Sequence, residues 1–277
     1  MIDRYIEKQR EIIDEYLARY LRQRRESLTE KLFDAMEHAL AGGKRLRPIL
    51  VLTAGEALKA TPEELLPAAA AIECFHTYSL IHDDLPAMDN SDMRHGRLAV
   101  HKKFDEATAI LAGDTLIPLG FELLAQEQAR YSSAKNTLIF IQSVSRVLGT
   151  AGLTGGQLLD LRFDRGDQPD VITMYERKTA ALIALSVSAP AILLKSSDAK
   201  RAALKKFGRA LGLAYQLIDD ILDADDERDK PTLARLWGIE KTRAQAQHLT
   251  SEAIESIKPL RSLRLEELAR FLLDRTY

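Results

Sequence analysis

Two short segments rich in aspartate are the most chemically suggestive part of this sequence. Residues 83–89 read DDLPAMD and residues 219–223 read DDILD, and an apolar run precedes each of them. Ligand sets made only of oxygen suit hard cations, and Mg²⁺ is usually bound by one or two carboxylates together with phosphate oxygens of a substrate. Two separated carboxylate clusters therefore indicate a magnesium site that acts on a phosphorylated substrate.

The surroundings of the two segments argue against the simpler interpretation, a solvated acidic surface. Carboxylates inside apolar stretches need a compensating charge. Asp219 and Asp223 are four residues apart, so a helix places both carboxylates on one face. Asp83 and Asp89 are six residues apart and would diverge on a straight helix. Because Pro86 lies between them, we expect the helix to bend or end there.

Basic and small residues that suit an anionic substrate lie elsewhere in the chain. Residues 42–48 read GGKRLRP, in which three cations surround an expected helix start, and the unpaired N–H groups of a helix start favour anions. Residues 177–179 read RKT, and residues 155–157 read GGQ, which permits close backbone approach. His76 lies seven residues before Asp83 on the same helix face, where a cationic or hydrogen-bonding ring would reach a second anion. Each feature alone would be an ordinary turn, helix start or core residue.

The elements that must position these residues are helices. Apolar residues recur at helical spacing from the beginning of the chain to its end, and the alternating pattern of a β-strand is missing. Pro48 and Pro62 are placed as in the first turns of helices, and Gly42 and Gly43 as at a helix end. The sequence predicts one all-α domain over residues 1–277, with about ten helices. Loops are expected near residues 90–98, 130–134, 164–170 and 224–232.

Composition narrows the classes of function. The formal net charge of -2 provides no general attraction for nucleic acid or for an anionic membrane. The N-terminus is charged, and serines and Pro190 interrupt the longest apolar stretch, residues 180–194, so we expect no membrane span and a cytoplasmic location. Cys74 is the only cysteine, which excludes a disulfide within the chain and disfavours a cysteine-based zinc site.

Several segments follow one another at defined spacing: GGKRLRP at 42–48, HTYSLIHDDLPAMD at 76–89, LAGD at 111–114, GGQ at 155–157, Lys178-Thr179 and QLIDDILD at 216–223. In this order they resemble the trans-isoprenyl diphosphate synthases. The resemblance covers nearly the whole chain, and Tyr78-Ser79 with the LPAM sequence of the first acidic segment is most similar to bacterial farnesyl diphosphate synthases. It implies an all-α bundle of about ten or more helices around a central active-site cavity, usually in a homodimer.

The resemblance also implies roles for individual residues. In this family the two acidic segments bind about three Mg²⁺ ions that bridge to the diphosphate of an allylic substrate. The implied Mg²⁺ ligands are Asp83, Asp89, Asp219 and Asp223, and the implied catalytic residues are Asp83, Asp84, Asp89, Lys178 and Asp219. Contacts to the allylic diphosphate are implied for Arg94, Lys178, Thr179 and Gln216, and contacts to isopentenyl diphosphate for Lys44, Arg47, His76 and His95.

The implied reaction condenses isopentenyl diphosphate with dimethylallyl and then geranyl diphosphate, and the implied chain-length residues are Tyr78 and Ser79. Tyr78 lies five residues before Asp83, about 7–8 Å along a helix, so its ring would close the pocket behind a fifteen-carbon product, farnesyl diphosphate. Geranyl or geranylgeranyl diphosphate remains an alternative product. A non-catalytic diphosphate-binding subunit is a further alternative, whereas GGKRLRP and His76 imply a second diphosphate site and disfavour a terpene cyclase.

The chain departs from the family pattern at two places. The family usually has a second arginine where this chain has His95, so a permanent charge becomes a titratable ring and we expect weaker binding of isopentenyl diphosphate. After Asp223 the family has a longer loop with Gly-Lys before Lys-x-Thr, whereas residues 224–229 here lead directly to Lys230. Either Lys230 or Arg228 replaces the missing substrate-covering lysine, or the shortened loop closes the site less completely.

Overall fold

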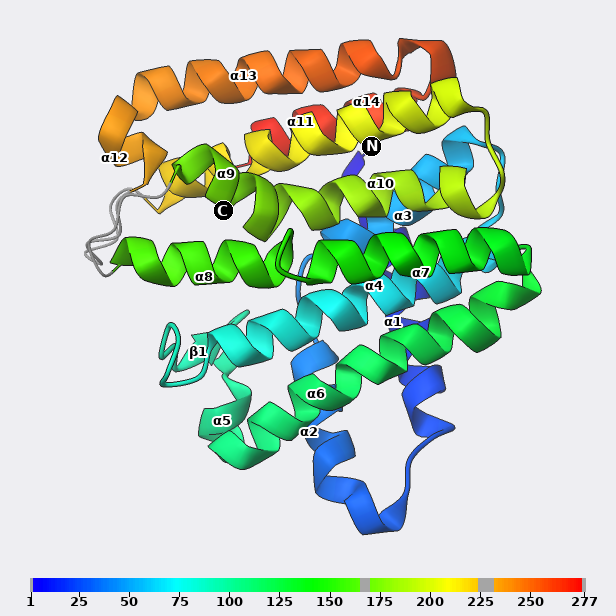
Figure 1. The fold of residues 1–277 in the computed structure, drawn as a ribbon, viewed down its shortest axis with the longest axis vertical. Coiled ribbons are helices and arrows are strands. Elements are labelled where there is room, and N and C mark those ends of the chain that lie inside the picture. The colour runs from blue at the N-terminus through cyan, green and yellow to red at the C-terminus, as the bar shows by residue number, and fades with distance from the viewer. Residues whose placement is uncertain (1, 165–169, 224–231, 276–277) are drawn as a thin grey trace. The chain divides into compact units, whose positions relative to one another are not determined.

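A computed structural model describes residues 2–164, 170–223 and 232–275 of the chain. Almost all of these residues are helical, so the predicted all-α class is confirmed (Figure 1). Backbone packing divides the chain into two compact units. The N-terminal unit comprises mainly residues 3–52 and 62–133, and the C-terminal unit mainly residues 53–61 and 134–277. That the chain is one domain stays a prediction.

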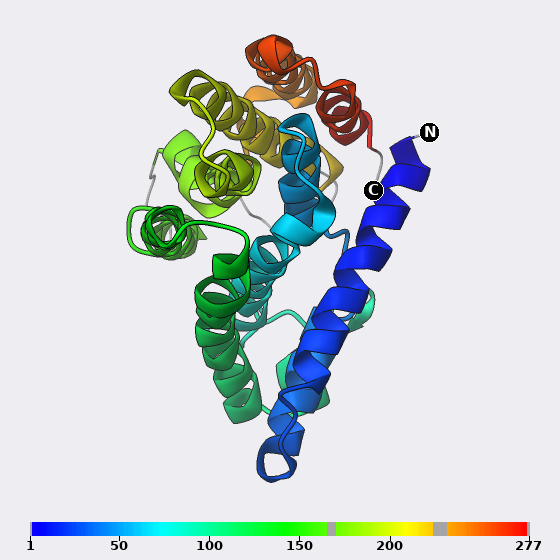
Figure 2. The same ribbon diagram turned by 90° about the vertical axis from the view of Figure 1, so that its right-hand side faces the viewer.

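The N-terminal unit is built around helix α4 (Pro62–Asp83). Its residues 65–75 are all buried, as expected for a helix that is apolar on almost every side. Helix α6 (Glu106–Glu122) lies beside it (Figure 2), and the approach is close, because a Cβ atom on Gly120 would lie 2.6 Å from the Phe75 ring. The other elements of this part of the chain are α1 (Ile2–Arg22), η1 (Ser27–Thr29), α2 (Glu30–Leu40), α3 (Leu46–Ala57, which continues into the C-terminal unit), β1 (Met93–Arg94), β2 (Arg97–Leu98), α5 (Val100–Lys103), η2 (Leu123–Glu127) and η3 (Gln128–Arg130).

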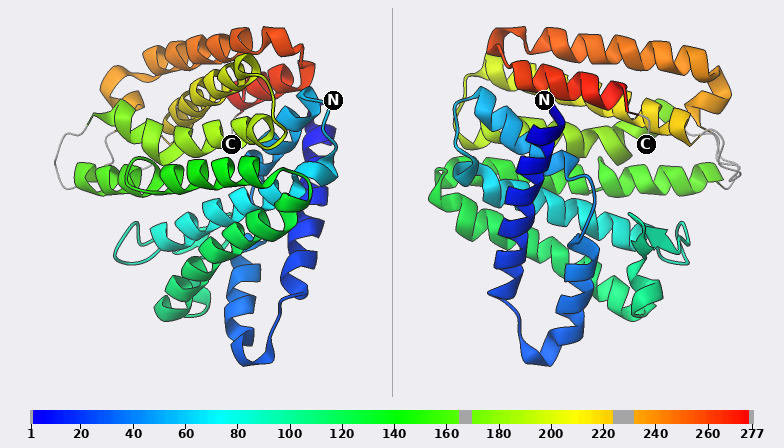
Figure 3. Two further views of the ribbon diagram at one scale, coloured as in Figure 1. Left: turned by 45° about the vertical axis from the view of Figure 1, so that its right-hand side comes forward. Right: turned by 180° about the vertical axis from the view of Figure 1, so that it is seen from behind.

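The C-terminal unit is built around helix α11 (Asp198–Leu222). Helix α13 runs along one side of it and α10 along another (Figures 1 and 3). A Cβ atom on Gly212 would lie 2.6 Å from the Cα atom of Ala180, so only glycine permits this approach of the π-helical turn η4 to α11. The other elements are α7 (Ala134–Leu148), α8 (Leu153–Asp164), α9 (Val171–Tyr175), η4 (Glu176–Ala180), α10 (Ala181–Leu193), α12 (Leu233–Trp237), α13 (Ile239–Ser256), η5 (Lys258–Leu260) and α14 (Leu263–Leu273).

Helix boundaries follow the proline and glycine signals of the sequence. Pro48 and Pro62 lie in the first turns of α3 and α4, as predicted. Helix α2 ends just before Gly42 and Gly43, which adopt φ angles of 87° and 82°. A left-handed conformation of this kind ends a helix and is accessible to glycine without steric cost.

The predicted loops have three different outcomes. The loop near residues 90–98 holds a short antiparallel hairpin, in which β1 pairs with β2; strands of two residues leave no alternating pattern, so the sequence did not predict them. The connection near 130–134 is confirmed between η3 and α7. The loops predicted at 164–170 and 224–232 fall almost entirely outside the described residues.

One helical run in the described part of the chain, Glu106–Arg130, is long and apolar enough to cross a membrane by length and composition. Within its most apolar window, 44% of the residues are buried inside the protein. The core helix of a globular protein passes the same test, so this run is weak evidence for a membrane span.

Candidate active site

The first acidic segment begins where helix α4 ends. Asp83 is the last residue of the helix, and the N–H group of Asp89 donates a hydrogen bond of 2.8 Å to the carbonyl oxygen of Asp83. The chain therefore turns back after the helix and brings together two aspartates that a straight helix would separate. The distortion predicted at Pro86 is confirmed, since the helix stops three residues before the proline.

Asp84, the second residue of this segment, has a different environment from its neighbours. It is only 2% exposed, and Arg94 on β1 donates from Nε to its Oδ1 atom over 3.0 Å, with a second, shorter bond from Nη2. Burial raises the pKa of Asp84, and the hydrogen bonds and charge of Arg94 oppose that rise. Arg94, expected to contact diphosphate, is here the compensating charge of a buried carboxylate.

His76 lies two turns before Asp83 and contacts the basic segment of residues 42–48. Arg47 Nη1 lies 3.0 Å from His76 Nε2, and because a guanidinium group only donates, Nε2 accepts and the ring is neutral in this contact. Burial, followed by the positive charge of Arg47, lowers the pKa of His76 well below its usual value. Of the two roles expected for this ring, the contact with Arg47 uses the hydrogen-bonding one.

His95 also reaches the basic segment, although the two lie far apart in the sequence. It occupies the turn between β1 and β2 at a φ angle of 51°, and its ring lies where a Cβ atom on Gly43 would be 3.2 Å from Cε1. Although the residue as a whole is exposed, desolvation of the ring and then the charge of Arg94 lower the pKa of His95. In the N-terminal unit, His76 and His95 thus lie near the basic segment of residues 42–48, which carries Arg47 and the exposed Lys44.

One of the three cations in this basic segment has an internal role that the sequence did not indicate. Arg45 is 5% exposed, and it donates to Asp14 Oδ1 over 2.6 Å and to Glu73 Oε1 over 2.7 Å. Its charge is therefore balanced inside the protein. Lys44 and Arg47, the two residues of this segment expected to contact isopentenyl diphosphate, remain the candidates for an anion.

The two expected chain-length residues lie within α4, before its end. The Tyr78 side chain is buried, and its ring meets the His82 ring edge-on at a centroid distance of 5.9 Å. Ser79 Oγ donates to the carbonyl oxygen of His76 over 2.8 Å. Tyr78 thus provides a large ring on α4 before Asp83, whereas the Ser79 hydroxyl is hydrogen-bonded to the backbone of the same helix.

The second acidic segment lies at the end of α11. Asp219 is in the last turn, and the N–H group of Asp223, the residue after the helix, donates to the Asp219 carbonyl oxygen over 2.9 Å. Arg275 Nη2 donates to Asp219 Oδ1 over 2.6 Å, and its guanidinium group lies 3.6 Å above the Tyr215 ring. Arg275, from near the C-terminal end of this unit, thus balances the Asp219 charge, and no local pattern in the sequence predicts that pair.

Asp220, the neighbour of Asp219, points into the C-terminal unit and is 2% exposed. Its Oδ2 atom accepts from the Tyr175 hydroxyl over 2.5 Å and from the Leu233 N–H group over 3.1 Å, and its Oδ1 atom accepts from Gln216 Nε2 over 3.2 Å. Burial raises the pKa of Asp220 to about 6, against the lowering effect of these three hydrogen bonds. The sequence reading did not identify Tyr175, which lies 45 residues away.

Lys178 and Thr179 lie together in the π-helical turn η4, a geometry that is frequent at functional sites. Thr179 Oγ1 donates to Gln216 Oε1 over 2.7 Å, so two residues expected to bind the same diphosphate contact each other. Lys178 Nζ pairs with Asp160 of α8, a partner that the sequence reading did not identify.

The GGQ triplet belongs to helix α8 and packs against this turn. A Cβ atom on Gly156 would lie 2.3 Å from the backbone nitrogen of Lys178, so the expected close backbone approach is confirmed. Gln157, the next residue, is 8% exposed, and both polar atoms of its amide lack a hydrogen-bond partner. A buried amide without partners is costly, which makes it available to a ligand or to water.

The carboxylates of the two acidic segments could supply some, but not all, of the ligands of a hard cation. Among the described residues, no group of three or more histidine, cysteine or acidic side chains is arranged to hold a metal ion by itself. Each acidic segment provides a pair of carboxylate ligands. Such a pair suits Mg²⁺, because this ion completes its coordination with water and with phosphate oxygens of the substrate. Lys230, expected to cover the substrate, lies outside the described residues.

The chain is similar to known proteins over most of its length. The model of the polyprenyl synthetase family matches residues 29–229. A farnesyl diphosphate synthase of Escherichia coli (strain K12) is 41% identical over 260 residues, covering 86% of each chain. A geranylgeranyl pyrophosphate synthase of Arabidopsis thaliana is 38% identical over 257 residues, covering 86% of this chain and 74% of that protein. The crystal structure of an FPP/GFPP synthase from Zymomonas mobilis has a TM-score of 0.91 and 36% identity, covering 98% of both chains.

The family match, the identities and the shared fold agree with the order of acidic, basic and small-residue segments described above. The chain therefore belongs to the polyprenyl synthetase family and is a prenyltransferase, a trans-prenyl diphosphate synthase of the farnesyl or geranylgeranyl type.

Proposed function

We propose that this enzyme is a farnesyl diphosphate synthase, which condenses isopentenyl diphosphate first with dimethylallyl and then with geranyl diphosphate. The observation that carries the product length is Tyr78, a buried ring five residues before Asp83 on α4. Five residues correspond to about 7–8 Å of helix, and an aromatic ring at that depth stops a growing chain at fifteen carbons. The 41% identity with the farnesyl diphosphate synthase of Escherichia coli supports this choice.

The basic cluster of the N-terminal unit binds isopentenyl diphosphate in this proposal. Lys44 and Arg47 contribute charge, and the neutral His76 and His95 rings contribute hydrogen bonds or accept a proton as the anion arrives. Diphosphate binding favours the protonated rings, so it raises the depressed pKa values of both histidines. Binding is therefore coupled to proton uptake in the pH range between the pKa values of the free and the bound enzyme.

The acidic segments bind Mg²⁺ together with the allylic diphosphate. The proposed ligands are Asp83 and Asp89 of the first acidic segment and Asp219 and Asp223 of the second. Magnesium, when bound, supplies positive charge to the diphosphate leaving group. The proposed protein contacts of the same diphosphate are Arg94, Lys178, Thr179 and Gln216. Lys178 now pairs with Asp160, whereas Arg94 bonds to Asp84 through Nε and Nη2 and has further N–H groups for a phosphate oxygen.

The proposed chemistry needs no covalent enzyme intermediate. The C–O bond of the allylic diphosphate breaks and leaves an allylic cation, which survives only if the side chains around it exclude water. The double bond of isopentenyl diphosphate attacks that cation and forms the new C–C bond. The released diphosphate accepts the proton that leaves the adjacent carbon, and Lys178 and Arg94 hold the diphosphate in place for that transfer.

Product analysis tests this function directly. The purified protein is incubated with Mg²⁺, labelled isopentenyl diphosphate and, separately, dimethylallyl, geranyl or farnesyl diphosphate. A fifteen-carbon end product from the two shorter primers, with no elongation of farnesyl diphosphate, is the expected result. A twenty-carbon product would favour geranylgeranyl diphosphate synthase, the alternative that the Arabidopsis thaliana relative supports. Absence of product with every primer would favour a non-catalytic diphosphate-binding subunit.

Replacing Tyr78 with alanine is expected to lengthen the product. The ring is buried beside His82, and its removal leaves space where the proposal places the end of the growing chain. We expect the main product to shift from fifteen to twenty or more carbons, measured by chromatography of the dephosphorylated products. Ser79→Ala is the matched control, because it removes only a hydroxyl that is bonded within the helix. An unchanged product from Tyr78→Ala would show that another element closes the pocket.

Replacing His95 with arginine is expected to lower the KM for isopentenyl diphosphate about fivefold at pH 8, because a permanent charge replaces a neutral donor. The depressed pKa of His95 leaves its ring neutral at that pH. The advantage of arginine should shrink toward pH 6, where a phosphate-bound histidine gains its proton. A KM that is unchanged at both pH values would remove His95 from the binding site.

The proposal extends to assembly and location. We propose a homodimer in the cytoplasm. Large apolar side chains are exposed on α6, where Leu111 is 55% exposed, and on α7, where Leu138 is 57% exposed. A mass twice that of the 277-residue chain in analytical ultracentrifugation is the expected result.

A further inference from the structure

The two adjacent aspartates of the second acidic segment have unlike environments. The Asp219 side chain is 34% exposed at the end of α11, whereas Asp220 is 2% exposed and points into the C-terminal unit. On a helix, successive residues are about 100° apart, so one of the pair can face a ligand while the other faces the protein core. The acidic segment therefore contains residues with two kinds of role.

The Asp220 carboxylate is already occupied by protein donors. Its Oδ2 atom accepts two hydrogen bonds, from Tyr175 and from the Leu233 backbone, and its Oδ1 atom accepts one from Gln216. A carboxylate buried among three donors has little capacity left for a metal ion, because three of its roughly four acceptor positions are already used. Asp220 is thus an acceptor that joins protein segments.

The segments joined at Asp220 include those that carry substrate-binding residues. Tyr175 ends helix α9 and is followed directly by the π-helical turn that holds Lys178 and Thr179. A second bond, from Thr179 to Gln216, and the close approach at Gly212 connect the same two elements. The Tyr175–Asp220 bond therefore fixes the turn that carries Lys178 relative to the end of α11.

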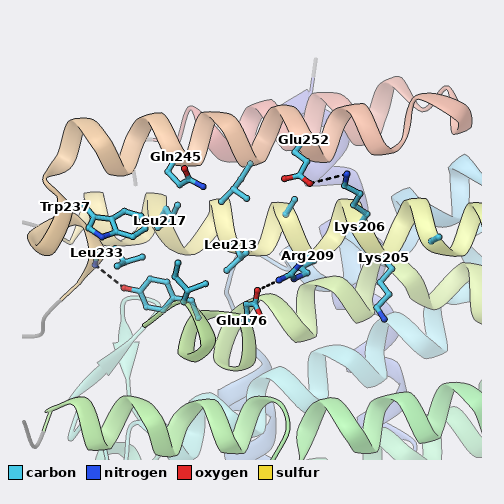
Figure 4. Close-up of a pocket in the computed structure, with 15 residues that line it drawn as sticks. Glu176, Lys205, Lys206, Arg209, Leu213, Leu217, Leu233, Trp237, Gln245 and Glu252 are labelled. Atoms are coloured by element: carbon cyan, nitrogen blue, oxygen red, sulfur yellow. Dashed lines mark hydrogen bonds and ion pairs between the residues drawn. The ribbon is translucent and has the colours of Figure 1, made fainter. Parts of the chain in front are cut away.

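Tyr175 is buried at the border between the apolar core of the C-terminal unit and a cavity. Tyr175 belongs to an apolar cluster, yet it also lines a cavity of about 560 Å³ between α9, α11, α12 and α13. Figure 4 shows Leu217, Leu233 and Trp237 along one part of that cavity. The apolar contacts hold the ring of Tyr175, and the hydrogen bond to Asp220 fixes the direction of its hydroxyl group.

We propose that Tyr175 is a positioning residue, which acts through Asp220 to hold Lys178 and Thr179 at the correct place relative to the metal ligand Asp219. Asp220 itself is an anchor for Tyr175 and for the start of α12, and does not bind the metal ion. This inference rests on the proposed role of Asp219 in binding Mg²⁺. It predicts that loss of the Tyr175 hydroxyl group weakens binding of metal and allylic diphosphate together.

The test compares four purified variants: Tyr175→Phe, Asp220→Asn, Asp219→Asn and, as a matched control, Tyr131→Phe at a residue that is 45% exposed. Mn²⁺ binding is measured by electron paramagnetic resonance in the presence of an unreactive thio analogue of dimethylallyl diphosphate. Kinetic constants are measured separately for the two substrates. Melting temperatures show whether each variant folds.

Tyr175→Phe is expected to weaken Mn²⁺ binding and lower kcat about tenfold each, with the KM for isopentenyl diphosphate within about twofold of the wild-type value. Asp220→Asn keeps a carbonyl oxygen for Tyr175 and Leu233 and loses only the acceptor for Gln216, so its Mn²⁺ affinity should stay within about threefold of the wild type. That second variant decides whether Asp220 is a ligand even if Tyr175→Phe fails to fold.

Three outcomes separate the possible failures. Normal Mn²⁺ binding and normal kcat in Tyr175→Phe would overturn the positioning role. A loss of Mn²⁺ binding in Asp220→Asn as large as in Asp219→Asn would show that Asp220 is a ligand, which also overturns it. Normal Mn²⁺ binding in Asp219→Asn would instead contradict the proposed metal site on which the inference rests.

Discussion

Replacing Asp83 with alanine is expected to lower kcat/KM about a thousandfold while the protein keeps its fold. Carboxylates that hold Mg²⁺ on a leaving diphosphate contribute several kcal/mol of transition-state stabilisation, and about 4 kcal/mol corresponds to a thousandfold in rate. Asp83 ends α4 and is half-buried rather than part of the core, so its side chain is not needed for helix packing. Steady-state kinetics at saturating Mg²⁺ and a thermal melt measure the two quantities.

The matched control for this prediction is Asp92→Ala, in the same connecting region. Its side chain is 70% exposed and pairs with Lys102 on the surface, so both activity and stability should be close to wild type. Asp219→Ala should repeat the Asp83 result, because it removes a carboxylate from the second acidic segment. Activity within tenfold of wild type in both Asp83→Ala and Asp219→Ala would contradict the assignment of these residues to metal binding.

Replacing Arg94 with methionine is expected to destabilise the protein by about 3–5 kcal/mol at pH 8, because it leaves the buried Asp84 without its compensating charge. Asp84 is 2% exposed and already has a raised pKa through burial. Chemical denaturation followed by circular dichroism measures the free energy of unfolding. Lys102→Met is the matched control. Lys102 pairs with Asp92 on the surface, so this substitution should lower the free energy of unfolding by less than about 1 kcal/mol.

The pH dependence of that variant gives a second test. Without Arg94, the folded-state pKa of Asp84 rises further above its unfolded value, so the protonated carboxyl favours folding below the unfolded pKa and that benefit is lost as the pH rises through the folded pKa. The stability difference between Arg94→Met and the wild type should therefore narrow as the pH falls from 8 to 5. Replacing both residues, with Asp84→Leu and Arg94→Met together, should recover part of the lost stability. A difference that does not change with pH would show that Asp84 is not the group left uncompensated.

Much of the fold could be predicted because its determinants are local. Pro62 and Pro48 indicate helix starts, Gly42 and Gly43 indicate a helix end, and Pro86 indicates the end of α4 near the first acidic segment; all five are confirmed. Helical periodicity acts through residues three and four apart, so a single sequence contains it in full. The β1–β2 hairpin was not predicted, because strands of two residues are too short to show an alternating pattern.

The candidate site could be predicted as a set of chemical groups, but the partner of each group could not. Periodicity and burial indicate that a carboxylate such as Asp84, Asp219 or Asp220 needs a compensating group, without showing which one. The structure pairs Asp219 with an arginine 56 residues later and Asp220 with a tyrosine 45 residues earlier. Such pairs depend on which helix faces pack together.

The sequence by itself determined the all-α class, the helix ends beside both acidic segments and the family, because these depend on residue types at fixed spacing along the chain. Only the tertiary structure decided that Arg45 is an internal cation, that Arg94 compensates Asp84 and that Tyr175 bonds to Asp220. The physical reason is that burial and long-range hydrogen bonds arise when distant helices pack. Their contribution to the free energy of folding therefore depends on two elements at once, and it cannot be predicted from either stretch of sequence alone.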